Sequence, residues 1–125
     1  MEKHTSAVLL DYTHDDLRRA LTIVAGKWKL EILWLLHHRA HRFGELKRAI
    51  PGVTQHMLTS QLRELESDGL ITREVFAEVP PKVVYEITTA AQALEPSIVS
   101  ILSWWRDHGS RAQRRAKASK FAGRR

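Results

Sequence analysis

The chain has 125 residues, of which 43% are hydrophobic and 27% charged, and its formal net charge is +6. This is the size of one domain with a single modest core, and the absence of cysteine excludes a switch based on thiol chemistry. No apolar run reaches the roughly eighteen residues of a membrane span and no secretory signal is recognisable, so we expect a cytoplasmic protein.

The N-terminal part is expected to hold one helix behind a flexible segment. Residues 1–12 carry no periodicity and form that segment. Thr13 then has the position of a helix N-cap, with Asp16 three residues further on, as in a capping box. The apolar face of this helix would consist of Leu17, Leu21 and Val24.

A second helix is expected after Gly26, from Lys27 to about His38. It is apolar nearly all round, which predicts the central buried element of the fold. His37, His38 and His41 stand near its end, and the first and last of them have the i, i+4 spacing that can share a metal ion. Because no cysteine or well-spaced carboxylate supplies a further ligand, we predict no metal site and assign these histidines to the helix end, whose dipole favours positive charge.

Residues 43–69, FGELKRAIPGVTQHMLTSQLRELESDG, have the pattern of a helix-turn-helix. A short helix and a longer helix are joined by a tight Pro51-Gly52 turn, and in both helices apolar residues recur at helical spacing. These residues are Phe43, Leu46 and Ile50 in the first helix and Leu58, Leu62 and Leu65 in the second.

The longer helix carries its own start and stop signals. Thr54 precedes it, so the threonine hydroxyl can cap free N–H groups while Val53 packs inward as a staple. Gly69 ends it by accepting a left-handed conformation. Polar side chains remain on its outer face near the N-terminal half, where such helices meet base edges in the major groove. The predicted DNA-binding residues of this helix are Thr54, Gln55, His56, Thr59, Ser60 and Arg63.

Two strand-like runs follow directly. Leu70 to Phe76 is rich in β-branched and aromatic residues, and Lys82 to Ile87 alternates with Val83, Tyr85 and Ile87 on one face. The prolines between the runs exclude a helix there. Helix, turn, helix and hairpin together predict a winged helix-turn-helix, in which positive charges contact the DNA backbone. The predicted backbone-contacting residues are Lys27, for which an ordinary surface lysine is the alternative, Arg42, Arg73 and Lys82.

After the wing, Thr88 or Thr89 is expected to cap another helix, which Pro96 interrupts with a kink or a restart. An apolar stripe at i, i+3, i+4, i+7 follows, and one such stripe suffices for packing on the domain. The stripe consists of Ile98, Ile101, Leu102 and Trp105. Trp104 lies beside it, and this second apolar face indicates a partner surface. The alternative is a half-exposed Trp104 on a monomer.

The basic charge is concentrated at the C-terminus. Up to Gly109 the chain has 13 basic and 14 acidic residues, a formal charge near −1, whereas residues 110–125 carry +7. This basic tail either tracks phosphates, each neutralised phosphate adding a slope of about 0.9 in log affinity against log salt, or is a solvated end without a role.

Four segments carry a family resemblance: AGKWKLEILWLL, HRFGELKRAIPGVTQHMLTSQLRELESDGLITREVF, VPPKVVYEIT and LSWW. In this order they closely resemble the HxlR-type transcriptional regulators, a winged-helix group related to the MarR proteins, over residues from about Asp15 to Trp105. The chain departs from the family pattern at Asp15 and Asp16, where many relatives carry a Cys-Pro pair whose cysteine senses electrophiles or oxidants. It also has Ala25 and Ala91 where relatives often have glycine, and we expect small effects of these on the fold.

The resemblance implies a homodimeric bacterial regulator that binds double-stranded DNA. We expect it to repress transcription and to be associated with the nucleoid. The resemblance also implies that the first and last helices pair across a two-fold axis. The predicted dimer interface then consists of Leu17, Leu21, Ile98, Ile101, Leu102, Trp104 and Trp105. Such symmetry predicts an inverted-repeat operator, with half-site centres about 34 to 36 Å apart.

The expected fold is mainly α with a small β-hairpin (α+β), a winged helix-turn-helix that dimerises through its terminal helices. Residues 13–109 would form this domain, between the flexible segment 1–12 and the basic tail 110–125. No cofactor is expected. A small-molecule effector stays unidentified, and any such signal would act through the dimer interface on the spacing between the two recognition helices.

Other functions find less support in the sequence. No Gly-rich phosphate loop, Gly-x-Ser-x-Gly elbow or His-Glu-x-x-His motif occurs, so no enzymatic activity is predicted. A winged-helix module for protein–protein assembly, with only non-specific DNA affinity, is the main alternative, but it would carry apolar anchors on the outer face of the 54–66 helix. RNA binding would favour exposed aromatic residues, and the tryptophans are assigned to the core and the dimer.

Overall fold

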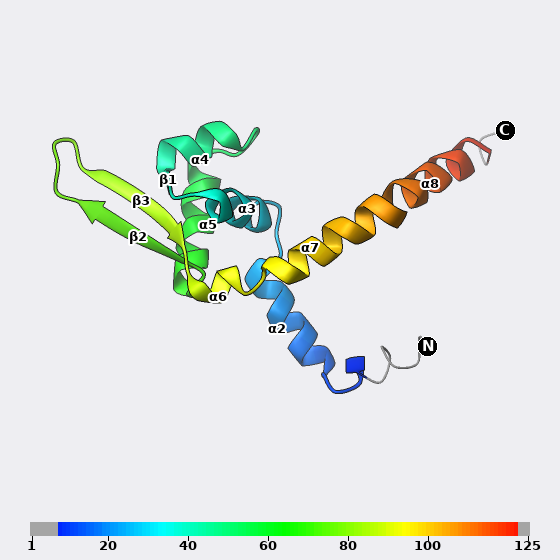
Figure 1. Cartoon of the computed structure of the whole chain (residues 1–125). Coiled ribbons are helices and arrows are strands. Elements are labelled where there is room, and N and C mark those ends of the chain that lie inside the picture. Colours follow the sequence, from blue (N-terminus) through cyan, green and yellow to red (C-terminus); the bar gives the residue numbers. More distant parts are fainter. Residues whose placement is uncertain (1–7, 123–125) are drawn as a thin grey trace. The chain divides into compact units, whose positions relative to one another are not determined.

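The computed structural model describes residues 8–122 (Figure 1). The chain divides into two units between Ala91 and Gln92. The helices of the first unit are α2 His14–Val24, α3 Lys29–His38, α4 Phe43–Ala49 and α5 Gln55–Ser67. The short α6 Thr89–Gln92 contains the boundary between the two units. Its strands are β1 His41–Arg42, β2 Ile71–Phe76 and β3 Lys82–Ile87. The second unit contains α7 Glu95–Trp104, the π-helical turn η1 Trp105–Gly109 and α8 Ser110–Ala122. The expected mainly helical fold with a small antiparallel sheet is confirmed.

The core of the first unit lies where α3, α4 and α5 meet the sheet. Its largest fully buried side chains are Ile32, Leu36, Leu46, Ile50, Leu58, Leu62, Leu65 and Ile71. The prediction of a buried central helix is therefore confirmed for one side of α3. It is wrong for the other side, because Leu30 is exposed and the side chain of Trp34 is 50% exposed. Trp34 instead meets the ring of His38 edge to face, with centroids 4.6 Å apart.

The sheet has the order β1-β3-β2, and all its strands are antiparallel. The predicted hairpin is confirmed as β2 and β3, which extend away from the helices in Figure 1. The two-residue β1 pairs with β3 through His41–Tyr85 and Arg42–Val84. The sequence did not predict β1, because two residues are too few to show an alternating pattern.

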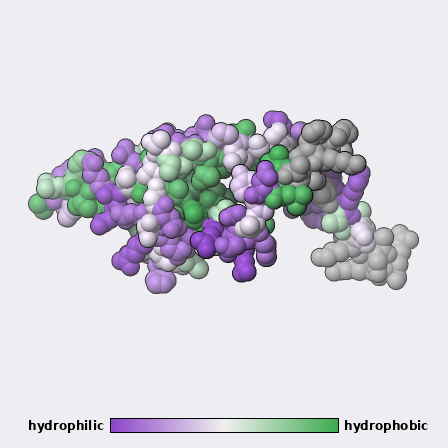
Figure 2. All heavy atoms as spheres, turned by 90° about the horizontal axis from the view of Figure 1, so that it is seen from below, coloured by the Kyte–Doolittle hydropathy of each residue, from purple (hydrophilic) through white to green (hydrophobic). Residues whose placement is uncertain are grey.

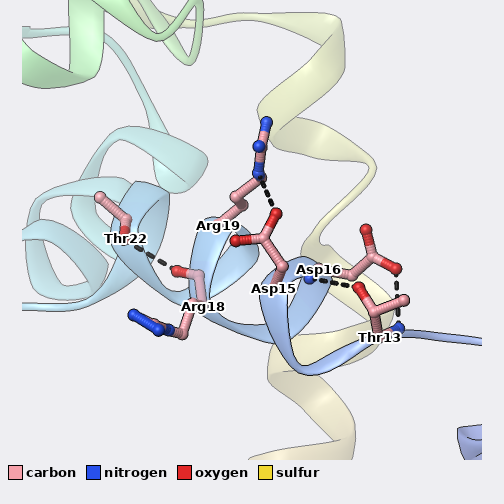
Figure 3. Close-up of polar contacts among 6 residues, drawn as sticks. All are labelled: Thr13, Asp15, Asp16, Arg18, Arg19 and Thr22. Carbon is pink, nitrogen blue, oxygen red and sulfur yellow. Dashed lines mark hydrogen bonds and ion pairs between the residues drawn. The ribbon is translucent and has the colours of Figure 1, made fainter.

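Helix α2 begins with the predicted capping box (Figure 3). The backbone N–H of Thr13 donates to the Asp16 carboxylate over 2.8 Å, and the N–H of Asp16 donates to the Thr13 hydroxyl over 3.0 Å. Asp15 pairs with Arg19 over 2.6 Å one turn further on. No residue of α2 is buried, and its apolar face remains open. Of the expected flexible segment, residues 1–7 lie outside the described residues, residues 8–9 are helical and residues 10–12 form a turn.

The predicted interruption after the wing is confirmed in the second unit. The Thr88 hydroxyl accepts from the N–H of Ala91 and caps α6, and the chain restarts as α7 with Pro96 in its first turn. Of the predicted apolar stripe, Ile101, Leu102 and Trp105 are exposed. The helix continues through η1, where a Cβ on Gly109 would overlap the Trp105 ring.

Within the described part of the chain, no helix is long and apolar enough to span a membrane.

Candidate nucleic-acid interface

The helix-turn-helix consists of α4, the Pro51-Gly52 turn and α5. Gly52 has a φ of +86° and Gly69, just after α5, a φ of +77°, values that side chains with a Cβ rarely adopt. The Thr54 hydroxyl accepts a hydrogen bond from the N–H of Met57 over 3.1 Å, which confirms the predicted N-cap. Val53 is buried beside it, as a staple requires. These local contacts fix where α5 begins.

The N-terminal half of α5 presents polar side chains to solvent. Thr54, Gln55 and His56 are exposed, as is Arg63 two turns later, whereas Thr59 and Ser60 are half-buried. The Thr59 hydroxyl donates to the carbonyl of Gln55 over 2.8 Å, so only its lone pairs remain for another partner. The predicted set therefore gathers along one accessible helix surface.

Met57 is a further exposed side chain at the start of α5, and the sequence did not single it out. Its side chain is 43% exposed in the first turn of α5. An apolar side chain at this place can contact a thymine methyl group in the major groove. The signal that could have revealed it is its helical phase, since Met57 falls outside the row of Leu58, Leu62 and Leu65.

A pocket of about 240 Å³ lies between α5 and the wing. It is lined by Thr59, Leu62, Arg63, Glu66, Arg73 and Tyr85. Arg73 of β2 lies 3.9 Å from the Glu66 carboxylate of α5. Burial raises the pKa of the Tyr85 hydroxyl, while the nearby guanidinium of Arg73 acts in the opposite direction. The pocket therefore brings the predicted residues Thr59, Arg63 and Arg73 together, one of them from the wing.

The strand register separates the two basic residues predicted for the wing. Arg73 pairs with Tyr85 and Lys82 pairs with Phe76, and because paired residues share a face, Arg73 and Lys82 point to opposite faces of the hairpin. Lys82 instead covers the Phe76 ring, with its ammonium 5.3 Å from the ring centroid. Only Arg73 lies beside the recognition helix, in the pocket that both elements line.

The wing is less basic than expected for a backbone clamp. Residues 71–87 contain Arg73 and Lys82, but also Glu74, Glu78 and Glu86. Apolar side chains are exposed toward its tip, including Val75 and Val79. Figure 2 shows hydrophobic surface at the left end of the view, where the hairpin lies. Attraction of phosphates by the wing would therefore depend on Arg73 and Lys82 individually.

The remaining basic candidates flank the motif. Arg42 is exposed in β1, and its pairing with Val84 places it on the same sheet face as Lys82. The backbone N–H of Arg42 donates to the Glu45 carboxylate over 2.9 Å. The guanidinium of Arg42 takes no part in this hydrogen bond. Lys27 is exposed and stacks over the Trp28 ring, 4.8 Å from the centroid. This contact suits the surface-lysine interpretation.

The three clustered histidines have partners of their own. His38 donates to the carbonyl of Trp34 over 2.7 Å, and the buried His41 donates to the carbonyl of Arg39 over 2.8 Å. Among residues 8–122, no three His, Asp or Glu side chains converge in a way that could hold a metal ion.

The residues predicted for the dimer interface are exposed in the single chain, apart from one. In the first unit, Leu17 and Leu21 are exposed along α2, beside an open hollow of about 710 Å³ that includes Leu9, Tyr12 and Ala20. In the second unit, exposed apolar side chains run along α7 and into η1, and Ile98 is half-buried. They are Ile101, Leu102, Trp104 and Trp105.

Comparison with known proteins agrees with this geometry. The model of the family described as HxlR-like helix-turn-helix matches residues 23–113. A Bacillus subtilis (strain 168) protein, the HTH-type transcriptional regulator YdeP, is 41% identical over 116 residues, which are 89% of this chain and 91% of that protein.

Solved structures of regulators have the same fold. The redox regulator HypR in its reduced form is 38% identical, with a TM-score of 0.73 over 78% of this chain and 96% of that chain. A transcriptional regulator of the MarR family from Enterococcus faecalis V583 is 39% identical, with a TM-score of 0.72 over 82% of this chain and 94% of that chain. The matched family and these relatives are regulators of transcription and not enzymes. The chain belongs to the HxlR-like helix-turn-helix family of transcriptional regulators.

Proposed function

We propose that the protein binds one operator sequence as a homodimer and represses transcription by occupying a promoter. Helix α5 would enter the major groove with its N-terminal half, and two such helices related by a two-fold axis would read an inverted repeat. The observation that carries the proposal is the capped, exposed and polar start of α5, where Gln55 and His56 stand free to meet base edges.

Support for base reading comes from the kind of side chains on this surface. A protein-assembly surface depends on buried aromatic and aliphatic anchors, whereas the outer face of α5 offers one amide, one imidazole, two hydroxyls and one guanidinium. Arg63 and Arg73, which line the pocket between α5 and the wing, would hold the flanking phosphates.

Support for a homodimer comes from the apolar surfaces that the single chain leaves open. Helix α2 has no buried residue, and α7 and η1 expose two tryptophans together with Ile101 and Leu102. A monomer gains nothing from exposing such side chains. A second copy of the chain would cover both surfaces and fix the distance between its α5 helices.

Any control of the regulator would differ from a thiol switch. HypR is named a redox regulator, but the 125 residues of this chain contain no cysteine. An effector would have to act by favouring one separation of the two α5 helices over another. The open hollow beside α2 lies on the proposed dimer surface, and an apolar molecule bound there would act on that separation.

Selection of bound fragments from sheared genomic DNA of the source organism tests the proposal. The purified protein is incubated with fragments at physiological salt, and the bound DNA is sequenced. We expect a few sites that share an inverted repeat, with half-site centres about one helical turn apart. Diffuse fragments that are released by moderate salt would overturn the operator proposal and favour the protein-assembly module with non-specific DNA affinity.

A further inference from the structure

The C-terminal helix α8, Ser110–Ala122, has a charge pattern that the recognition of an operator by α5 does not explain. Its sequence, SRAQRRAKASKFA, contains five basic residues and no acidic residue. The chain before it has a formal charge near −1. The basic balance of the protein therefore resides in this helix and the few residues after it.

The basic side chains of α8 form an ordered surface. Arg111, Arg114 and Arg115 follow one another at i, i+3 and i+4, so they share one helix face within roughly 6 Å along the axis. All three are exposed, as is Lys117 on a neighbouring face. None of the four makes an ion pair with another described residue. Three guanidinium groups are thus aligned without a counter-charge.

This arrangement is unfavourable for an isolated helix. Like charges at i, i+3 and i+4 repel each other and weaken the helix that carries them, and α8 contains no carboxylate that would compensate. The closest acidic residue before it, Asp107, is already paired with Arg106 over 3.7 Å. A bound polyanion would remove the repulsion and stabilise the helix at the same time.

The other side chains of α8 indicate which kind of polyanion it binds. An interfacial membrane helix needs a broad apolar face with large side chains. Here the residues between the basic positions are small or polar, namely Ala112, Gln113, Ala116, Ala118 and Ser119. Guanidinium groups in a row suit the phosphates of a nucleic-acid backbone, which they contact without reading sequence.

We propose that α8 is a second DNA-binding surface, which contacts backbone phosphates independently of sequence and adds affinity to the operator recognition proposed for α5. It supplies the salt-sensitive part of binding, whereas α5 supplies the preference for one sequence. The inference rests on the proposed DNA-binding function but not on the existence of one specific operator.

The test compares two triple variants of the full-length protein. One replaces Arg111, Arg114 and Arg115 by glutamine, and the matched control replaces the same three residues by lysine. Both replacements are good helix formers. Affinity for a non-operator duplex is measured at several salt concentrations, and circular dichroism at 222 nm records helicity with and without DNA. A duplex recovered by genomic selection is titrated in parallel.

We expect the glutamine variant to lower the slope of log affinity against log salt by up to about 2.7 per chain, at about 0.9 for each lost phosphate contact. The lysine control should keep the slope of the unmodified protein, and DNA should increase helicity in both the control and the unmodified protein. The ratio of affinities for selected and non-operator duplexes should stay unchanged in all three proteins.

An unchanged slope in the glutamine variant would overturn the proposal. Binding of the unmodified protein to phosphatidylserine vesicles, lost in the glutamine variant while its DNA slope stays intact, would overturn it in favour of a membrane. If the unmodified protein prefers no sequence but the slopes differ as expected, the operator proposal fails while α8 remains a phosphate-binding helix.

Discussion

The ammonium group of Lys29 lies 2.7 Å from the carboxylate of Glu64 and joins α3 to the recognition helix α5. The lysine side chain is 5% exposed, whereas that of Glu64 is 52% exposed. Lys29 also donates to the carbonyl of Thr22 near the end of α2, over 3.4 Å. One buried cation therefore contacts α5 and the helix proposed to dimerise, and it fixes both relative to α3.

Replacing Glu64 and replacing Lys29 should lower the free energy of unfolding by different amounts. Glu64→Gln leaves the Lys29 charge buried without its carboxylate, and we expect a loss of about 1 to 2 kcal/mol in the free energy of unfolding, less than for a fully buried pair because Glu64 is half exposed. Lys29→Met replaces the cation by an apolar side chain of similar length and should cost less than Glu64→Gln. Urea unfolding at neutral pH measures both losses, and a larger loss for Lys29→Met than for Glu64→Gln would contradict this expectation.

The fold could be predicted from the sequence largely because its signals are local. Thr13, Thr54 and Thr88 each cap a helix as expected, and Gly69 ends α5 with a positive φ. The alternation in residues 82–87 marks β3, with Tyr85 as its buried residue. Each of these features depends on a few neighbouring residues, so a single sequence contains the information.

Features that depend on contacts between distant segments could not be predicted. Lys29 is buried because Glu64, 35 positions later, meets it, and nothing near Lys29 in the sequence indicates this. Arg73 and Lys82 both suit the DNA backbone by residue type, and only the pairing of β2 with β3 reveals that they lie on opposite faces. Trp34 was expected in the core, because the sequence shows that a helix is apolar but not how much of its surface other elements cover.

The Glu45 carboxylate should make stability depend on pH at the start of the helix-turn-helix. The backbone N–H of Arg42 donates to it over 2.9 Å and lowers the pKa of the carboxyl below its ordinary value, and Arg39 adds a smaller effect in the same direction. A group whose pKa is lower in the folded state stabilises that state above its unfolded pKa, which for Glu45 is the ordinary value of 4.5. This contribution is then lost as the pH falls through the lowered pKa of the folded protein.

The free energy of unfolding of Glu45→Gln should therefore change less with pH in the acidic range than that of the unmodified protein. We expect the variant to be less stable than the unmodified protein at pH of about 7, and we expect the two curves to converge as the pH falls below the lowered pKa of the Glu45 carboxyl. Urea midpoints across this range measure the difference. Glu74→Gln on the wing serves as control, because no described residue donates a hydrogen bond to the side-chain carboxylate of Glu74. If the stability curves of Glu45→Gln and the unmodified protein run parallel across this pH range, the Glu45 carboxylate is not the source of the pH dependence.

Gln55 should contribute to sequence preference and not to general affinity. It stands exposed at the first position of α5, directly after the cap Thr54. A good bidentate contact of an amide with adenine discriminates by about 1 to 3 kcal/mol, so Gln55→Ala should lose roughly five- to 150-fold in affinity for the selected operator. Titrations of operator and random duplexes at the same salt measure this, with Gln61→Ala on another face of α5 as control. An equal loss on random DNA would identify Gln55 as a backbone contact.

The exposed apolar residues of α7 should hold the dimer together. Ile101 and Trp104 are both more than half exposed in the single chain, so glutamates at these positions leave the isolated chain folded but place charges where a partner would bury them. The double variant Ile101→Glu with Trp104→Glu should therefore be monomeric in sedimentation measurements and bind operator DNA much more weakly. Ile101→Leu with Trp104→Phe keeps the surface apolar and should remain dimeric. A double glutamate variant that retains the dimer mass would exclude this face of α7 from the interface and leave α2 as the surface to test next, beginning with Leu17 and Leu21.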